Sequence, residues 1–328
     1  MLFLDRDDIK NVFGMKDAIE ADKIAYSIFS EGKGESPLRT NFESKSEKGN
    51  ILFMPGYIGD LGVAGLKVVS VFPNNDKHGL PSISGTVMLV DDKTGLLKVI
   101  LDGTYVTELR TGASTGAAIS LFARKGSKIA CLFGTGGQAE SQFDAILAAC
   151  DTIEEIRVYS RNKNNRVKFV DKMIKKYGRD LIKIVAANDK ESALDNADII
   201  VLATTSQVPV INGDLIKKGA LVSGIGSYTP AMHEIDEKTL LKADKIYFDS
   251  KDAVLSEAGC FITPLKNGII SEDRFTGDIG DFINGKLIGR ENDDEIIVFK
   301  SVGISVQDLV TGELIYKKAV EKGVGKQV

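Results

Sequence analysis

The sequence predicts an α/β protein in which an α+β domain with an antiparallel sheet precedes a doubly wound parallel sheet. Up to about residue 103, one helical stretch is followed by several strand-like runs, whereas later strand-like runs alternate with helical ones. Consecutive strands favour an antiparallel sheet, and alternation is typical of a parallel sheet covered by helices. A glycine-rich turn directly after the first strand of the alternating part supports the second assignment,.

The first part of the chain predicts one helix and a group of strands. The helix covers residues 14–29 and ends at a turn that contains Gly32 and Gly34,. Residues 91–95, with a late glycine, are typical of a hairpin loop between the last two strands,. The expected strands are residues 51–54, 64–72, 85–90 and 96–101.

The second part predicts alternating strands and helices. A helix rich in small residues at 105–123 leads to a strand at 128–133, then to a glycine-rich turn and a helix that ends at Ala149,. A C-terminal helix at 306–321 is expected to pack back on the first domain. The remaining strands are expected at 156–159, 182–186, 198–203, 220–223 and 245–248, and the remaining helices at 164–177 and 191–196.

Composition and charge exclude several classes of protein. The 328 residues carry a net charge of −4 without a basic cluster, which argues against nucleic-acid binding,. No apolar run reaches the roughly 18 residues of a membrane span, and the acidic first turn is unlike a signal peptide,. The three cysteines and two histidines have no spacing typical of disulfide frameworks or metal sites,. We therefore expect a cytoplasmic protein without a metal.

Residues 134–139 read Gly-Thr-Gly-Gly-Gln-Ala, a variant of the dinucleotide-binding fingerprint of Rossmann domains,. Gly134 allows the tight turn, Gly136 lets the backbone approach a pyrophosphate, and Ala139 lets the helix pack on the strand. Gly137 and Gln138 lie at the helix start, where free N–H groups bind phosphates. The alternative is a glycine-rich turn without a ligand.

The strand that follows indicates which dinucleotide binds. NAD sites usually place an acidic residue at its end, but here residues 159–163 read Tyr-Ser-Arg-Asn-Lys,. Ser160, Arg161 and Asn162 are therefore candidate cofactor contacts, and Arg161 with Lys163 favours the 2′-phosphate of NADP(H), although NAD(H) is possible. The alternative is that Arg161 is a solvated loop cation.

Several strings resemble the ornithine cyclodeaminase and μ-crystallin family. They are residues 65–74 (GLKVVSVFPN), 102–103 leading to 107–113 (TELRTGA), 224–230 (GIGSYTP) and 301–303 (SVG), in the family's order. The resemblance implies a tightly bound nicotinamide cofactor and a homodimer formed through the antiparallel sheet. The domains would then be a substrate-binding and dimerisation domain at residues 1–115 and 304–328, and a Rossmann domain at residues 116–303.

The resemblance also implies a cluster of cations that holds a substrate carboxylate. The matching residues are Arg39, Lys67 and Arg110, and a cation clamp suits an amino or imino acid. Lys67 lies in an apolar strand, where a lysine without a partner requires a ligand and can move a proton as a catalytic group. The alternatives are a solvent-facing Lys67 and a surface position for Arg110.

Further cofactor contacts are expected from position and from the resemblance. Thr111 lies beside Arg110, and two threonines follow a predicted strand at the end that faces the cofactor. The residues after the last family string would approach the nicotinamide. These candidates are Thr111, Thr204, Thr205, Ser301, Val302 and Gly303.

Two departures from the family pattern concern the substrate. Where the ornithine-converting members carry acidic residues, this chain has Leu52 and Tyr228. A buried side-chain ammonium without a counter-charge is strongly disfavoured, so ornithine is not the expected substrate. Tyr228 is a catalytic candidate, either as a proton donor or as a wall of an apolar pocket.

The sequence therefore predicts an NAD(P)H-dependent oxidoreductase of a cyclic imine carboxylate or a small amino acid, as an imine reductase or an amino-acid dehydrogenase. The first alternative is an ornithine cyclodeaminase, which converts L-ornithine to L-proline and ammonia with catalytic NAD. The second is a non-catalytic cofactor-binding protein, against which the retained Lys67 and Arg110 argue. The expected partners are a small amino or imino acid and a second copy of the chain, not nucleic acid or a membrane.

Overall fold

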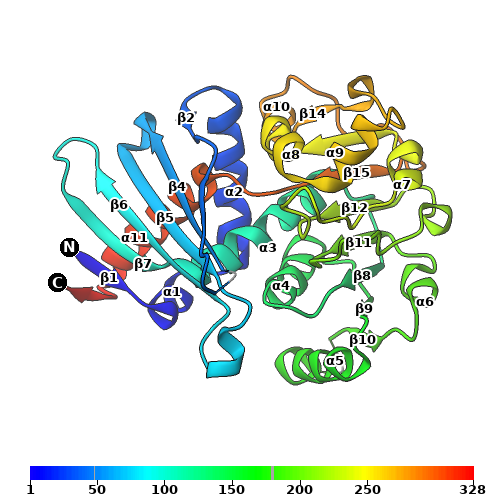
Figure 1. Cartoon of the computed structure of the whole chain (residues 1–328), viewed down its shortest axis with the longest axis horizontal. Coiled ribbons are helices and arrows are strands. Elements are labelled where there is room, and N and C mark those ends of the chain that lie inside the picture. Colours follow the sequence, from blue (N-terminus) through cyan, green and yellow to red (C-terminus); the bar gives the residue numbers. More distant parts are fainter. Residues whose placement is uncertain (48, 179–180) are drawn as a thin grey trace. The chain divides into compact units, whose positions relative to one another are not determined.

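The computed structural model describes residues 1–47, 49–178 and 181–328. The chain folds into two compact units, one of residues 1–110 and 304–328 and the other of residues 111–303 (Figure 1). None of the helices in these described ranges combines the length and hydrophobicity that a bilayer crossing requires.

The first unit contains a sheet in the order β16-β1-β7-β6-β5-β4-β2, with β3 paired to β4. Its long strands β4, β5, β6 and β7 are antiparallel neighbours, which confirms the predicted antiparallel sheet. The strands are β1 (Leu2–Leu4), β2 (Gly34–Glu35), β3 (Thr40–Glu43), β4 (Asn50–Ile58), β5 (Val63–Val71), β6 (Ile83–Asp91), β7 (Leu97–Asp102) and β16 (Lys326–Gln327).

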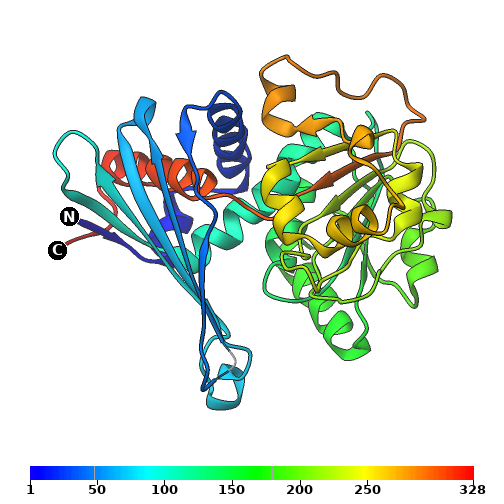
Figure 2. The same ribbon diagram turned by 45° about the horizontal axis from the view of Figure 1, so that its top comes forward.

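The C-terminal helix α11 covers this sheet. It packs across β4, β5 and β6 and against α1 and α2, as the sequence predicted, and Figures 1 and 2 show it lying along the sheet. Residues 305–313 are all buried, as are Ile315 and Ala319, and the helix ends at Gly323, whose φ of +64° favours glycine,. The helices are α1 (Arg6–Val12), α2 (Met15–Ser30), α11 (Ser305–Lys322) and α3 (Gly103–Phe122), of which only residues 103–110 belong to this unit.

The second unit is built on eight parallel strands in the order β10-β9-β8-β11-β12-β15-β13-β14. The strand order reverses between β8 and β11, and open α/β sheets bind ligands at the carboxyl ends of the strands beside such a reversal. The strands are β8 (Ile129–Phe133), β9 (Glu155–Tyr159), β10 (Lys183–Ala186), β11 (Ile199–Leu202), β12 (Leu221–Gly224), β13 (Lys245–Phe248), β14 (Gly277–Asp278) and β15 (Ile297–Lys300).

The predicted class, an α/β protein with one parallel and one antiparallel sheet, is confirmed, but part of the second unit was not predicted. β15 has only four residues, all buried, and it lies between β12 and β13 although it follows both in sequence. Such a short apolar run does not distinguish a strand from a helix. The helices are α4 (Ala139–Ala149), α5 (Lys163–Tyr177), α6 (Lys190–Leu194) and the unpredicted α7 (Glu237–Lys242), α8 (Lys251–Glu257), α9 (Gly259–Lys266) and α10 (Ile279–Ile283).

A buried carboxylate joins the first strands of this unit. Asp198, just before β11, is 4% exposed, and its Oδ2 accepts hydrogen bonds from the N–H groups of Lys128 and Ile129, at 2.8 and 3.0 Å. Its Oδ1 lies 2.7 Å from nitrogens of Arg124 and Lys217. Removing this carboxylate would leave two part-buried N–H donors and two partly exposed cations without their partner,.

We expect Asp198→Ala to lower the free energy of unfolding by about 2–4 kcal/mol, because two part-buried N–H groups and two cations lose their acceptor together. Urea denaturation measures the loss. The control is Asp294→Ala, which removes an exposed carboxylate from a surface pair with Lys218 and should leave stability unchanged. Equal stability of the two variants would show that the hydrogen bonds and ion pairs of Asp198 do not stabilise the fold.

Candidate active site

Lys67 lies in a buried ion pair. It is 1% exposed, and its Nζ lies 2.6 Å from Oδ2 of Asp308, a fully buried residue of α11. Arg110 of α3 approaches the other oxygen of the same carboxylate, with its Nε 3.2 Å from Oδ1. The expectation that Lys67 has no partner within the protein is therefore wrong, and so are the solvent-facing alternatives for Lys67 and Arg110. We call these three residues the Lys67 cluster.

The alternation of β5 places Lys67 in the interior. Val63, Lys67 and Val69 are buried while the intervening side chains are partly exposed, as expected when every second residue of a strand faces a covering helix. The residues opposite Lys67 on the neighbouring strands are Met54 and Val87, both buried and apolar. The strand neighbours therefore provide no charge to Lys67, and Asp308 of α11 does.

The Lys67 cluster has an excess of positive charge. Burial and the charge of Arg110 together lower the pKa of Lys67 to about 7, although Asp308 opposes the shift. Arg39 also lies near enough to lower this pKa, so the structure places all three predicted clamp residues in one neighbourhood. One carboxylate facing several cations leaves a buried positive charge that an anion would neutralise.

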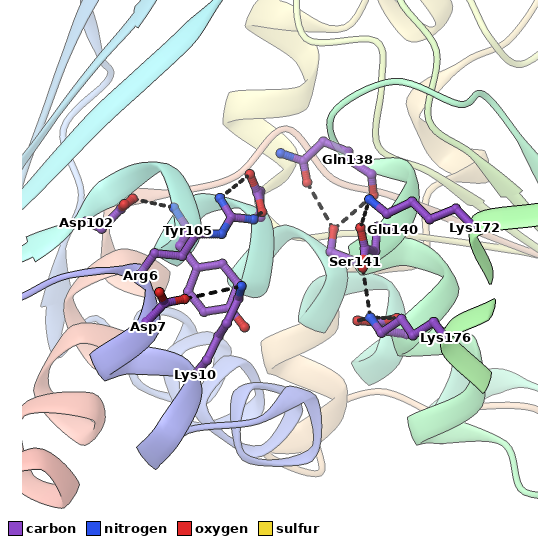
Figure 3. A network of polar contacts seen from close by, with 12 residues as sticks. Arg6, Asp7, Lys10, Asp102, Tyr105, Gln138, Glu140, Ser141, Lys172 and Lys176 are labelled. Atoms are coloured by element: carbon purple, nitrogen blue, oxygen red, sulfur yellow. Dashed lines mark hydrogen bonds and ion pairs between the residues drawn. The ribbon is translucent and has the colours of Figure 1, made fainter. Parts of the chain in front are cut away.

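The start of α3 is held in place by polar contacts, shown in Figure 3. Asp102 accepts a hydrogen bond from the N–H of Tyr105 at 2.8 Å, which caps the helix,. Arg6 forms an ion pair with Glu108, and its guanidinium lies over the ring of Tyr105, 4.8 Å from the centroid. These contacts fix the helical turn that leads to Arg110.

The glycine-rich loop connects β8 to α4 in the second unit. Gly134 has a φ of +113°, and a Cβ on it would overlap the backbone after β11, so this position requires glycine. Gly136 and Gly137 have open space where a side chain would be. At the start of α4, Ser141 donates a hydrogen bond to the carbonyl of Gln138 at 2.9 Å (Figure 3).

This loop fits a dinucleotide pyrophosphate. Within the described ranges, the N–H groups of Gly136 and Gly137 donate to no protein acceptor, and they lie at the N-terminus of the 11-residue helix α4. Free N–H groups and the helix dipole bind phosphate, and the missing side chains leave room for it. The residues present therefore fit the predicted cofactor.

The other predicted cofactor residues follow the carboxyl ends of neighbouring strands. β9, β8, β11, β12 and β15 are consecutive in the sheet, and their last residues pair in register. Their following segments therefore share one edge of the sheet, on both sides of the strand reversal. These segments contain Ser160, Arg161 and Asn162 after β9, Thr204 and Thr205 after β11, and Ser301, Val302 and Gly303 after β15.

Thr111 lies beside α4. Gln142 of α4 donates a hydrogen bond from Nε2 to the carbonyl oxygen of Thr111, at 2.9 Å. The Thr111 hydroxyl is buried and has no hydrogen-bond partner among the described residues. An unpaired buried hydroxyl is unfavourable unless a ligand or water satisfies it, which agrees with its prediction as a ligand contact.

Glu234 organises this edge and was not predicted. Its fully buried carboxylate accepts hydrogen bonds from the N–H groups of Thr204, Gly226 and Ser227, at 2.6, 2.6 and 2.9 Å. Burial raises the pKa of Glu234, while nearby Lys300 opposes the rise. Nothing in the local sequence distinguishes this glutamate from a surface loop residue.

Asp249 has the same function at the end of β15 and was also missed. Its Oδ2 accepts hydrogen bonds from the Ser301 hydroxyl at 2.7 Å and from the N–H groups of Val302 and Gly303, at 2.9 and 2.6 Å. The acid follows β13, the neighbouring strand, and is 1% exposed. Its only sequence signal is a position directly after an apolar strand.

The chain crosses from one unit to the other twice, each time beside a candidate site residue. The first falls within α3, between Arg110 and Thr111, and the second between Gly303 and Ile304. The clamp candidates thus belong to the first unit, and the nucleotide candidates belong to the second.

The two family departures lie in different units. Leu52 is on β4, opposite Val69 and two residues before Met54, the partner of Lys67. Leu52 thus places an apolar side chain on β4, two residues from the strand partner of Lys67. Tyr228 lies in the loop after β12 and is half-buried, and its predicted catalytic function stays a prediction.

Comparisons with known proteins place the chain in a family. A sequence model of the "Ornithine cyclodeaminase/mu-crystallin family" matches residues 1–323. A Δ(1)-pyrroline-2-carboxylate reductase of Bacillus thuringiensis subsp. konkukian is 36% identical, covering 100% of this chain and 99% of the relative. The Thermococcus litoralis Δ(1)-pyrroline-2-carboxylate reductase, solved with NADH and L-proline, is 39% identical with a TM-score of 0.94, covering all of both chains.

A second solved relative is an archaeal alanine dehydrogenase dimer with bound NAD. It is 31% identical with a TM-score of 0.91, covering 100% of this chain and 98% of that one. These full-length matches confirm the resemblance that the sequence strings indicated. The chain belongs to the ornithine cyclodeaminase/mu-crystallin family.

Proposed function

We propose that the protein reduces a cyclic imine carboxylate, Δ1-pyrroline-2-carboxylate, to L-proline with NAD(P)H. The observation that carries this proposal is the buried excess of positive charge in the Lys67 cluster, which suits a substrate carboxylate,. The names of the relatives support the choice of substrate. The second candidate is a small amino-acid dehydrogenase, favoured by the similarity to the alanine dehydrogenase.

The cation cluster and its surroundings favour a substrate with one acid group and an apolar ring. Arg110 provides a planar guanidinium that can bind a carboxylate in two places, and Lys67 provides a point charge beside it. Leu52 leaves no negative charge on β4 for a second ammonium,. We therefore propose a neutral ring, which ornithine with its side-chain ammonium is not.

Imine reduction adds a hydride to carbon and a proton to nitrogen. The nicotinamide, when bound, supplies the hydride, and Gly136, Gly137 and the segment 160–162 are the groups that would hold the dinucleotide. Lys67 is the proposed proton source, because a lysine with a pKa of about 7 exchanges its proton readily near neutral pH,. Tyr228 is the alternative donor, or it lines the pocket.

The reaction itself is tested by following nicotinamide absorbance and ammonia together. With Δ1-pyrroline-2-carboxylate and NAD(P)H, we expect oxidation of one cofactor for each L-proline formed and no ammonia. Alanine with the oxidised cofactor tests the second candidate. Ammonia release from L-ornithine without net absorbance change would replace both with a cyclodeaminase.

We expect Lys67→Met to lower kcat/KM at least about 100-fold, because a charged partner of the substrate acid is lost. The matched control is Lys98→Met. Lys98 also pairs with a buried acid of α11, Glu313, at 2.7 Å, but it is not a clamp candidate. Steady-state kinetics of both variants distinguish the site from a general effect of removing a lysine, and comparable losses would refute the assignment.

We also propose a preference for NADP(H) over NAD(H). Arg161 and Lys163 are exposed after β9, so their charges are available to a 2′-phosphate. The solved relatives hold NADH or NAD. A preference for NADP(H) would therefore distinguish this protein from them.

For the cofactor, we expect Arg161→Ala to raise KM for NADPH about tenfold and to leave KM for NADH unchanged, since only NADPH carries the 2′-phosphate. Lys168→Ala is the control, an exposed cation further along α5. A wild-type preference for NADH that Arg161→Ala leaves unaltered would exclude the proposal.

A homodimer formed through the antiparallel sheet is proposed from its apolar face. Leu66 and Val68 of β5 alternate with Lys67 and thus lie on the face opposite α11,. Three of their four cross-strand neighbours, Phe53, Pro55 and Met88, are also apolar and incompletely buried, and the fourth is the exposed Thr86. A partly exposed apolar face of this kind favours burial against a second copy. The similarity to an alanine dehydrogenase that was solved as a dimer supports a homodimer.

A charge placed on this face should disrupt the dimer. We expect Met88→Glu to give a monomer by light scattering after size-exclusion chromatography, because the interface would bury an unpaired charge. Val320→Glu is the control, since Val320 is 56% exposed on α11. A Met88→Glu protein with the wild-type mass would place the interface elsewhere.

The location is proposed to be the cytoplasm. All three cysteines, Cys131, Cys150 and Cys260, are free, and two of them are buried. Free thiols are typical of proteins in a reducing compartment.

A further inference from the structure

We propose that Asp308 is a positioning residue of the active site, which keeps Lys67 charged so that it binds the substrate carboxylate together with Arg110. This inference rests on the proposed function. It assigns a function to the C-terminal helix, whose residues carry none of the predicted site groups.

The geometry gives each cation its own oxygen of Asp308. Lys67 Nζ lies 2.6 Å from Oδ2, and Arg110 Nε lies 3.2 Å from Oδ1. Although the first contact is close, Lys67 Nζ has no well-oriented hydrogen bond to any described residue. The ammonium is thus paired in charge, while its N–H groups remain available to a ligand.

The helix that carries Asp308 is anchored beside it. Gln307 donates hydrogen bonds from Nε2 to Asp22 Oδ2 at 2.7 Å and to the Tyr26 hydroxyl at 2.9 Å, and it accepts one from the N–H of Ile304 at 3.0 Å. All of these side chains from α2 and α11 are buried. The first turn of α11 is therefore a firm support for the carboxylate.

The other groups that face Lys67 do not favour its charged form. Arg110 of α3 and Arg39, just before β3, both lower the pKa of Lys67, and burial lowers it most. Its partners on β4 and β6 are the apolar Met54 and Val87. Among the described residues, Asp308 is the one carboxylate within 4 Å of Lys67. Without it, the neutral amine would predominate at neutral pH.

The test follows binding of pyrrole-2-carboxylate, a planar and unreactive acid, to the full-length protein saturated with oxidised cofactor. Calorimetry between about pH 5.5 and 9.5 gives the basic limb, the pH above which affinity falls as Lys67 loses its proton. We expect Asp308→Asn to move this limb to lower pH by about one unit or more, so that binding at about pH 8 weakens tenfold or more.

The acidic end of the same profile separates positioning from simple damage. Below the limb of the variant, Lys67 is protonated in both proteins, and the variant lacks the competing carboxylate. We therefore expect affinity there to be equal to or tighter than that of the wild type. A structural defect would weaken binding at every pH, and this result would overturn the proposal.

One control variant changes another acid of α11, and two further variants keep a charged group at each position of the Lys67–Asp308 pair. Glu313→Gln breaks the other buried lysine pair of α11 and should leave the limb in place, whereas Asp308→Glu should restore much of it. Lys67→Arg keeps Asp308 and has a cation that does not titrate in this range, so the limb should disappear. This variant decides the question if Asp308→Asn does not fold, because a retained limb would overturn the proposal.

The outcome is independent of the proposed reaction. A shifted limb in a protein that does not reduce Δ1-pyrroline-2-carboxylate would support Asp308 and refute the reaction. Turnover of the imine with an unshifted limb would retain the reaction and refute Asp308. Absence of binding to the wild type would refute the carboxylate site and this proposal with it.

Discussion

The candidate site depends on one carboxylate that holds two cations in the protein interior. Asp308 draws together Lys67 of the fifth strand and Arg110 of the third helix, residues that are far apart in the sequence. Burying charges is favourable only with close partners, and here the partners do not balance. The remaining positive charge is the feature on which the proposed binding of a substrate carboxylate rests.

The sequence predicted the elements that carry Lys67 and the glycine-rich turn, but not the side-chain contacts between elements. The apolar strand 63–71 identified Lys67, and the glycine string identified the turn after β8, because both patterns are local,. Asp308 looked like an ordinary acid in the first turn of a helix, where acids are common. Its ion pair with Lys67 forms because α11 packs across β5. A local sequence pattern does not predict such packing.

The same limit applies to the second unit. Glu234 and Asp249 each use one buried carboxylate to collect several backbone N–H groups, so that the segments after β11, β12 and β15 keep a defined course. Ligand contacts at this edge can then come from backbone and small side chains. β15 was missed for a related reason, since its place between β12 and β13 is set by the sheet.

The unbalanced charge around Lys67 also lowers the stability of the folded protein, although the proposed function requires this charge. With a pKa of about 7 in the folded chain and an ordinary value of 10.5, the lysine binds its proton less well when folded. The resulting penalty is present below about pH 7 and fades as the pH rises toward 10.5,. A bound acid relieves it, so occupancy and thermal resistance should increase together. If only the stability of the ligand-free protein were under selection, this lysine would be replaced.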